Sequence, residues 1–170
     1  MFMDATHPQH NPVISYGWIK RGKEHPIKSN TGRRRLNING AIDVQRMSAE
    51  IRFDDTIDAV STIALFEQIE HANPLAKRIT IICDNARYYR SKAVAKYLEN
   101  SRINLLFLPP CSPNLIERFW KFFKRQVLYN HYYEAFDDYK NACKRFFREL
   151  DAYGPQLRSL LTENFEIIGN

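Results

Sequence analysis

Residues 78–124 read RITIICDNARYYRSKAVAKYLENSRINLLFLPPCSPNLIERFWKFFK. An apolar run over residues 79–83 stops at Asp84, and a second apolar run over residues 103–108 stops at two prolines. The segment between them has the spacing of an amphipathic helix. A strand, a crossover helix and a second strand within about 30 residues have the length of a right-handed parallel βαβ unit. We therefore predict such a unit here.

The remaining segments predict further strands before this unit and helices after it. Residues 13–20, 33–44 and 48–53 are rich in strand-forming residues, and their spacing favours an antiparallel meander beside the parallel unit. Asp54 or Asp55 is expected to cap a helix that runs to about His71 and ends at Asn73. The resulting order βββ-α-β-α-β-α is typical of an α/β, ribonuclease H-like mixed sheet flanked by helices.

The C-terminal third is predicted to be helical. A helix begins near Asn114 and carries an apolar, aromatic stripe that we expect to be mostly core. A second helix is predicted over residues 134–150, and Gly154 followed by Pro155 is expected to break it. We expect residues 1–150 to form one domain and residues 151–170 to form a short helical tail.

Composition narrows the class of protein. The chain has 170 residues, 44% of them hydrophobic, which is enough for one folded core. No apolar stretch approaches the roughly 18 residues that a membrane helix needs, and no basic segment precedes an apolar one as in a secretory signal. The three cysteines are widely spaced, which fits a reducing, cytoplasmic compartment.

The charge is unevenly distributed along the chain. The net charge is +6, and residues 19–35 contain seven basic residues against one acid. Such a segment suits a polyanion, although a solvated surface is the simpler alternative. The residues that we expect to contact phosphates are three consecutive arginines and three basic residues of the aromatic helix, namely Arg33, Arg34, Arg35, Arg118, Lys121 and Lys124.

Two carboxylates occupy informative positions. Asp84 follows a buried strand, where open α/β sheets bind their ligands, and Glu117 lies in the first turn of the aromatic helix. Carboxylates brought together repel unless they are protonated or bridged by a cation, and Mg²⁺ prefers oxygen ligands. Taken singly, Asp84 could cap a turn, and Glu117 could be an acid favoured by the helix dipole.

Several spaced motifs together resemble the catalytic domain of the DDE transposases of the bacterial IS630 and Tc1/mariner superfamily. They are FMDATHPQHNP at residues 2–12, GRRRLNINGA at 32–41, DNAR at 84–87, LPPCSPN at 108–114 and IERFW at 116–120. The resemblance implies an acidic triad of Asp4, Asp84 and Glu117 that binds two Mg²⁺ or Mn²⁺ ions. It also implies metal-dependent cleavage of DNA phosphodiester bonds followed by strand transfer.

The resemblance carries expectations about partners. It implies DNA as the substrate, both transposon ends and target, and a second copy of the chain as a partner. The DNA-binding region that precedes the catalytic domain in the family is missing from the sequence. Two explanations stay open: the chain is the downstream reading frame of an interrupted gene, with a separate polypeptide that supplies this region, or the sequence is a fragment. No membrane partner is expected, and the expected location is the bacterial cytoplasm, at the nucleoid.

The sequence also departs from the family pattern. The spacing between Asp84 and Glu117 is short, and Cys111 stands where the family favours tyrosine. If the shortening lies in the loop, Glu117 keeps its direction; if it lies in the helix, Glu117 turns away. We favour the loop because residues 116–121 keep their helical spacing. Only three residues precede Asp4, so the first strand looks clipped.

Three alternatives to a working enzyme remain open from the sequence. One is an inactive relic whose short loop and short first strand abolish metal binding. Another is a basic nucleic-acid-binding module without catalysis. The third is an unrelated zinc protein that uses His7 and His10, although zinc sites need three or four ligands and no pair of cysteines lies nearby.

Overall fold

The protein alternates strands and helices around one sheet. A computed structural model describes residues 1–13, 28, 34–110 and 112–161. Its strands are β1 (Phe2–Thr6), β2 (Asn37–Asp43), β3 (Ser48–Asp54), β4 (Ile79–Cys83) and β5 (Ile103–Phe107). Its α-helices are α1 (Ala59–Ala72), α2 (Lys92–Leu98), α3 (Leu115–Val127), α4 (Phe136–Arg148) and α5 (Gly154–Leu160), and its 3₁₀ helices are η1 (Arg87–Arg90) and η2 (Leu150–Tyr153).

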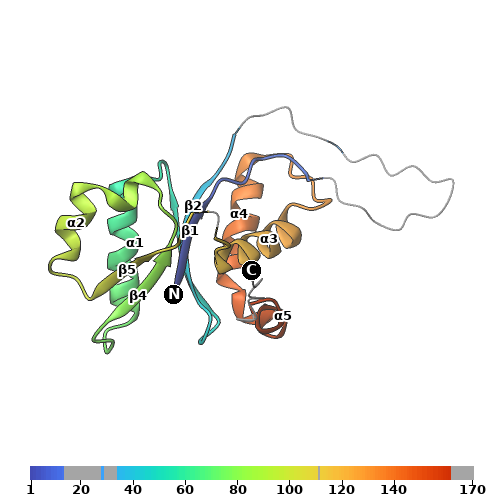
Figure 1. Ribbon diagram of the computed structural model, residues 1–170. Helices are drawn as coiled ribbons and strands as arrows, with labels where there is room; N and C mark the ends of the chain where they lie inside the picture. The colour runs from blue at the N-terminus through green and yellow to red at the C-terminus, as the bar shows by residue number, and fades with distance from the viewer. Residues whose placement is uncertain (14–27, 29–33, 111, 162–170) are drawn as a thin grey trace, which may run out of the picture.

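The five strands form one mixed sheet in the order β3-β2-β1-β4-β5. Helices α1 and α2 lie on one side of the sheet, and α3, α4 and α5 lie on the other (Figure 1). Each layer of helices encloses its own apolar cluster against the sheet. The predicted mixed sheet flanked by helices is therefore confirmed.

Strand β1 lies at the centre of the sheet. All five of its residues pair antiparallel with β2, and Phe2 pairs parallel with Ile82 of β4. The ammonium group of Met1 also donates to the carbonyl oxygen of Thr80, at 2.8 Å. Although β1 is short, it is held on both sides.

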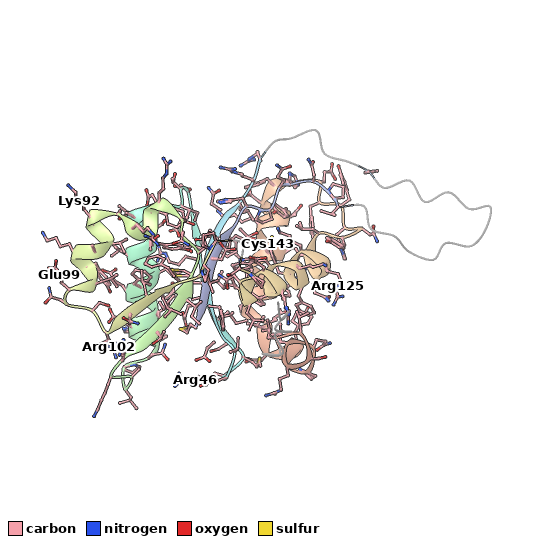
Figure 2. All side chains as sticks on the ribbon, viewed as in Figure 1. Arg46, Lys92, Glu99, Arg102, Arg125 and Cys143 are labelled. Carbon is pink, nitrogen blue, oxygen red and sulfur yellow. The ribbon has the colours of Figure 1, made fainter. Side chains whose placement is uncertain are left out.

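The predicted βαβ unit is confirmed. Strands β4 and β5 pair in parallel over their full length, from Ile79 opposite Ile103 to Cys83 opposite Phe107. Arg102 attaches the start of β5 to α1. Its guanidinium donates to main-chain carbonyls at the C-terminal end of α1 and just beyond it. Figure 2 shows Arg102 on the same side of the molecule as α2.

The start of α1 differs from the prediction. Neither Asp54 nor Asp55 caps the helix, because β3 continues through Asp54. Asp58 is the N-cap instead, and its side chain forms a capping box with Ser61. Val60, which the spacing assigned to the apolar face, is 74% exposed. The predicted end at Asn73 is confirmed.

The aromatic helix is buried as predicted, whereas the end of the next helix differs from the prediction. All of the stripe on α3 is buried, and it forms one cluster with side chains of α4. The break after α4 falls at Glu149 rather than at Gly154. Gly154 instead begins α5. The first turn of this helix tolerates Pro155, because residues there donate no N–H hydrogen bond within the helix.

Two further predictions concern residues 13–20 and membrane-spanning helices. Within the predicted strand over residues 13–20, Val13 forms an isolated bridge with Tyr129, and the rest lies outside the described residues. Among the helices that the structure describes, none is long and apolar enough to cross a membrane.

Candidate active site

Asp4 lies on the face of β1 that α3 covers. Its neighbour Met3 is buried on the α1 side, and side chains alternate along a strand. The cross-strand partner of Asp4 is Gly40. A Cβ atom on Gly40 would lie 2.8 Å from Cη2 of Trp120, so glycine lets the indole of α3 lie directly against the strands.

Asn114 fixes the start of α3 against β1. As the N-cap, its side-chain oxygen accepts from the N–H of Ile116 at 3.3 Å. Its amide nitrogen donates to the carbonyl oxygen of Met3 at 3.0 Å, within the protein interior. Glu117 completes a capping box, because its carboxylate accepts from the N–H of Asn114 at 3.3 Å. The first turn of α3 is thereby held next to Asp4.

Asp84 follows the last residue of β4 and is exposed. Its Oδ1 accepts from the N–H of Ala86 at 3.0 Å, which closes a tight turn before η1. The turn leaves Oδ2 without a hydrogen bond to the described residues. The turn-capping role considered from the sequence is thus real, but it occupies only one of the two oxygens.

The charges of Asp84 and Glu117 reach Asp4. The pKa of Asp4 is raised from 3.8 to about 6, mainly because burial disfavours the charged form. The N–H of Ala5 opposes the shift, and the negative charges of Asp84 and Glu117 add to it. Both acids therefore lie close enough to Asp4 to act on its charge.

Trp120 is the fourth side chain at this place. Its indole favours the ionised form of Asp4, which lowers the pKa. However, the buried Nε1 has no hydrogen-bond partner among the described residues. The indole N–H therefore lies near the carboxylate of Asp4 without forming a hydrogen bond to it.

The donor set suits a hard divalent cation, but the arrangement is open. The three acids offer only oxygen ligands, which Mg²⁺ and Mn²⁺ accept. Among the described residues, none of them forms an ion pair with Lys or Arg. In the same part of the chain, however, no three His, Cys, Asp or Glu side chains are close enough together to hold a metal ion. A cation would have to draw them closer, and Glu117 would offer Oε2, the oxygen that the capping bond does not use.

The two histidines considered for zinc have other contacts. His7 Nδ1 lies 2.8 Å from the side-chain oxygen of Asn37. His10 is buried, with Nε2 at 2.9 Å from the carbonyl oxygen of Tyr133 and its ring stacked on Tyr139. His7 thus attaches the segment after β1 to the start of β2, and His10 attaches it to Tyr133 and to α4.

The basic residues predicted to contact DNA fall into two groups. In the first group, Arg33 lies outside the described residues, and Arg35 forms an isolated bridge with Gln9. Arg34 is exposed, with its guanidinium 3.9 Å from the ring centre of Phe136. A stacked arginine keeps its edge available for phosphate.

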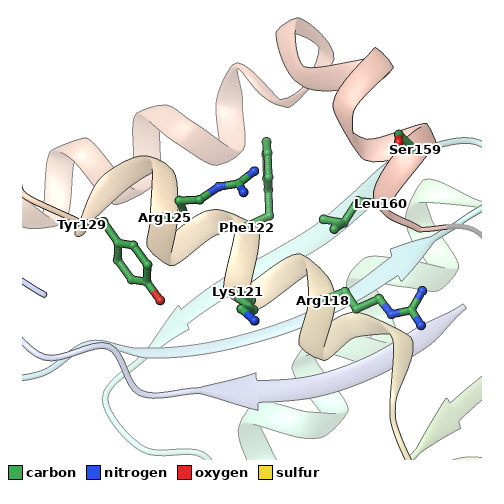
Figure 3. A pocket seen from close by; sticks show the side chains of 7 residues that line it. All are labelled: Arg118, Lys121, Phe122, Arg125, Tyr129, Ser159 and Leu160. Carbon is green, nitrogen blue, oxygen red and sulfur yellow. The ribbon is translucent and has the colours of Figure 1, made fainter. Parts of the chain in front are cut away.

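In the second group, Arg118 and Lys121 line a pocket of about 440 Å³ between α3 and α5. Its other lining residues are Phe122, Arg125, Tyr129, Ser159 and Leu160, as Figure 3 shows. Among the described residues no acid lines the pocket, and three cations lie around its aromatic side chains. Lys124 is half-buried and does not line it.

Comparisons with known proteins identify the family of the chain. The chain matches the family model of the DDE superfamily endonuclease over residues 1–140. The chain belongs to this family. An insertion element IS630 protein of 39 kDa from Shigella sonnei is 24% identical over 124 residues, which cover 71% of this chain and 36% of that protein.

Solved structures support the fold of this DDE-family chain. A Mos1 transposase paired-end complex with the left transposon end has a TM-score of 0.62 at 15% identity, covering 97% of this chain and 56% of the Mos1 chain. A simian T-cell lymphotropic virus intasome has a TM-score of 0.58 at 14% identity, covering 86% and 45%. The predicted ribonuclease H-like fold and the resemblance to IS630 and Tc1/mariner transposases are confirmed. The chain spans about a third of the IS630 protein and about half of the Mos1 chain.

Sequence reasoning missed several residues that shape the site of this DDE-family chain. Asn114 was identified only as the start of a helix, although Asn followed three residues later by Glu is a capping-box pattern. Gly40 and Arg90 gave no such signal. Their roles depend on residues that are distant in the sequence, Trp120 and Phe107 respectively.

Proposed function

We propose that this DDE-family chain is the catalytic domain of an IS630-type DNA transposase that cleaves phosphodiester bonds with the help of divalent metal ions. The observation that carries the proposal is the effect of Asp84 and Glu117 on the pKa of Asp4. Support comes from the electrostatic range of three acids that are far apart in the chain, in a fold shared with transposases.

In this proposal Asp4, Asp84 and Glu117 hold two Mg²⁺ or Mn²⁺ ions. Such ions supply charge neutralisation at the scissile phosphate and activation of the attacking oxygen. Asp4 must lose its proton for the ions to enter, and their charge favours that loss. Support comes from Mos1 paired-end complexes, which were solved with Mn and with Mg.

The chemistry proposed is phosphoryl transfer in two steps. A water oxygen first bonds to phosphorus while the bond to the 3′-oxygen breaks, and the leaving oxygen takes up a proton. The oxygen of the released 3′-hydroxyl then bonds to phosphorus of a target phosphodiester while the target's own bond from phosphorus to its 3′-oxygen breaks, and the proton of the attacking hydroxyl passes to the leaving oxygen. The carboxylates act by position, since phosphoryl transfer depends mostly on alignment and charge neutralisation.

DNA is proposed to contact the two basic groups that flank the acids. Arg34 and Arg35, together with Arg33, precede β2, whereas Arg118, Lys121 and Lys124 lie on α3. Cations of this kind would hold the negatively charged backbone next to the acids.

Further parts of the proposal concern the assembly. We propose residues 1–150 as the catalytic unit and 151–170 as a tail, of which Leu157 and Leu161 are buried with α3 in one cluster. A second copy of the chain and a polypeptide carrying an N-terminal DNA-binding region are proposed as partners. The proposed location is the cytoplasm, at the nucleoid.

Calorimetry with Mn²⁺ tests the metal site. We expect wild-type protein to bind Mn²⁺ and Asp84→Ala to lose that binding. Asp55→Ala is the matched control, because Asp55 is exposed and distant from Asp4 in the sheet. Equal binding by Asp84→Ala and wild type would contradict the assignment of Asp84.

Nicking of supercoiled plasmid tests the activity. We expect nicking with Mn²⁺ and a loss of at least about a hundredfold in Glu117→Gln, because carboxylate and amide have the same shape but not the same charge. Glu117→Gln retains the capping acceptor, so the helix start is preserved. Nicking that persists at the wild-type rate would exclude Glu117 from the reaction.

One observation favours a second candidate, an inactive DNA-binding relic. Within the described residues the acids are too far apart to form a ready metal site, and Glu117 is engaged in its capping box. DNA binding that is unaffected by chelator, without Mn²⁺ binding and without nicking, would establish this alternative.

A further inference from the structure

A groove of about 800 Å³ opens beside Asp84, between the turn after β4 and the segment after β5. Its wall on the β5 side is mainly apolar and consists of Leu108, Pro109, Pro110 and Ser112. Its cation is Arg90, the last residue of η1. Asp84 is the only acid that lines it among the described residues.

Arg90 is held in place by two uncharged partners. Its guanidinium lies over the ring of Phe107, 4.4 Å from the centre. Its Nη2 donates to the side-chain oxygen of Asn85. Asn85 in turn donates through Nδ2 to the carbonyl oxygen of Leu108, at 2.7 Å. The end of β5 and the turn after β4 together orient the cation.

The charge of Arg90 is not neutralised by a neighbouring acid. In the part of the chain that the structure describes, no carboxylate oxygen lies within 4 Å of its guanidinium nitrogens. The ring below and the amide alongside use one face and one N–H, whereas a guanidinium has five N–H donors. A fixed, solvent-exposed arginine with spare donors is well suited to a phosphate group.

The apolar wall indicates the kind of phosphate ligand. A duplex presents mainly phosphates and sugars at its surface, and its bases are stacked inside. An unpaired strand exposes its bases, which bind flat apolar and aromatic surfaces while a cation binds the backbone. A groove with one fixed cation and a proline-rich wall therefore fits single-stranded DNA better than duplex.

We propose that Arg90 binds a backbone phosphate of a single DNA strand in this groove, and so places the neighbouring phosphodiester at Asp84. The inference rests on the proposed function for its catalytic meaning, since that function makes Asp84 part of the cleavage site. Phe107 and Asn85 act as positioning residues for Arg90.

The test uses a fluorescently labelled single-stranded oligonucleotide and the duplex of the same sequence, in EDTA. We compare wild type with Arg90→Ala. The matched control is Arg87→Ala, which removes the same charge from an exposed residue of the same turn that does not line the groove. Thermal unfolding verifies that the variants fold.

We expect Arg90→Ala to weaken single-strand binding about tenfold, the typical effect of losing a charged hydrogen bond. The slope of log affinity against log salt should fall by about 0.7 for one lost phosphate contact on a single strand. Arg87→Ala should change the affinity less than about twofold, and duplex binding should change less than single-strand binding in both variants.

Three results would overturn the inference. They are equal losses in Arg90→Ala and Arg87→Ala, an equal effect of Arg90→Ala on duplex and single strand, and no single-strand binding by wild type. If Arg90→Ala fails to fold, Arg90→Lys replaces it and Arg87→Lys becomes the control. Lysine keeps the charge but loses the planar fork, so a loss of at least about threefold is expected in Arg90→Lys only.

The chelator separates this inference from the proposed function. Should Mn²⁺ fail to bind while Arg90→Ala selectively weakens single-strand binding, the catalytic proposal is wrong and the groove remains. Should Mn²⁺ bind and nicking occur while Arg90→Ala behaves as Arg87→Ala does, the groove is wrong and the catalytic proposal remains.

Discussion

The side-chain amide of Asn114 donates a hydrogen bond of 3.0 Å to the main-chain carbonyl of Met3, inside the protein. The bond joins the start of α3 to the residue that precedes Asp4 in β1. Because Glu117 lies three residues after Asn114 in the same capping box, one side chain sets the distance between two of the acids.

We predict that Asn114→Ala destabilises the fold by about 2–4 kcal/mol. The loss of an N-cap costs about 1 kcal/mol, and a buried carbonyl left without a donor adds about 1–3 kcal/mol. Urea unfolding measures the change. Asn100→Ala, at an exposed position, serves as control and should change the free energy of unfolding by less than about 0.5 kcal/mol. A loss in Asn114→Ala no larger than that of the control would show that the bond to Met3 does not hold α3.

We predict that Gly40→Ala lowers the free energy of unfolding and displaces the side chains next to Asp4. The new methyl would lie 2.6 Å from Cδ1 of Ile51 and 2.8 Å from Cη2 of Trp120, so the side chains must move. Overpacking of this kind costs about 1–3 kcal/mol. In Gly154→Ala the methyl would meet only the end of Arg158, at 3.7 Å, and we expect no loss.

A double variant separates the two causes. If the clash with the indole matters, Gly40→Ala combined with Trp120→Phe should be more stable than the sum of the single changes predicts, because the smaller ring makes room. Simple additivity would show that Ile51 alone carries the strain.

We predict that Asp4 makes the metal-free protein less stable as the pH rises. Below about pH 4 its carboxyl is protonated in both the folded and the unfolded chain. Between pH 3.8 and about pH 6 the unfolded chain releases a proton that the folded chain retains, so a rise in pH within this range favours the unfolded chain. Above about pH 6 the carboxyl is ionised in both states. The loss in free energy of unfolding is then constant and at most about 3 kcal/mol, at about 1.4 kcal/mol per pKa unit.

The measurement is the free energy of unfolding against pH, in chelator. Asp4→Asn lacks this titration, so its stability relative to wild type should increase between about pH 4 and pH 6. Parallel curves for the two proteins would mean that the pKa of Asp4 is not raised by burial and its acidic neighbours.

We predict that Lys121→Ala weakens duplex DNA binding through lost charge at the pocket between α3 and α5. One phosphate contact contributes about 0.9 to the slope of log affinity against log salt, so the slope should fall by about that amount. Lys92→Ala removes the same charge from α2, on the other side of the molecule (Figure 2). A similar fall in both variants would indicate a general effect of net charge.

Much of the fold follows from local patterns in the sequence. The alternation of apolar runs with a helical spacing was sufficient for the parallel unit, because two buried parallel strands must be joined by a crossover. The aromatic stripe on α3 was recognised as core for the same reason: its spacing matches one helix face. Patterns of this kind are repeated over many residues, so single exceptions do not obscure them.

Single-residue boundaries were less predictable. Asp54, Asp55 and Asp58 are all suitable N-caps by residue type. The helix begins after Asp58 because the pairing of β3 with β2 extends to Asp54. Gly154 and Pro155 read as a break, although proline is equally suited to the first turn of a helix. In both cases a contact distant in sequence selected between two local solutions.

The candidate site was predictable as residue types and not as geometry. The positions of Asp4, Asp84 and Glu117 followed from the family resemblance, whereas the raised pKa of Asp4 depends on burial beneath α3. The contact of Arg90 with Phe107 depends on the end of β5 lying next to η1, which no local pattern encodes.

The double engagement of Glu117 has a thermodynamic consequence. The N–H of Asn114 bonds to Oε1 alone, so movement of this carboxylate toward a cation would strain that bond, and ion occupancy and fraying of the first turn of α3 become linked quantities. Amide exchange at Asn114 would then report the loading of the acidic centre.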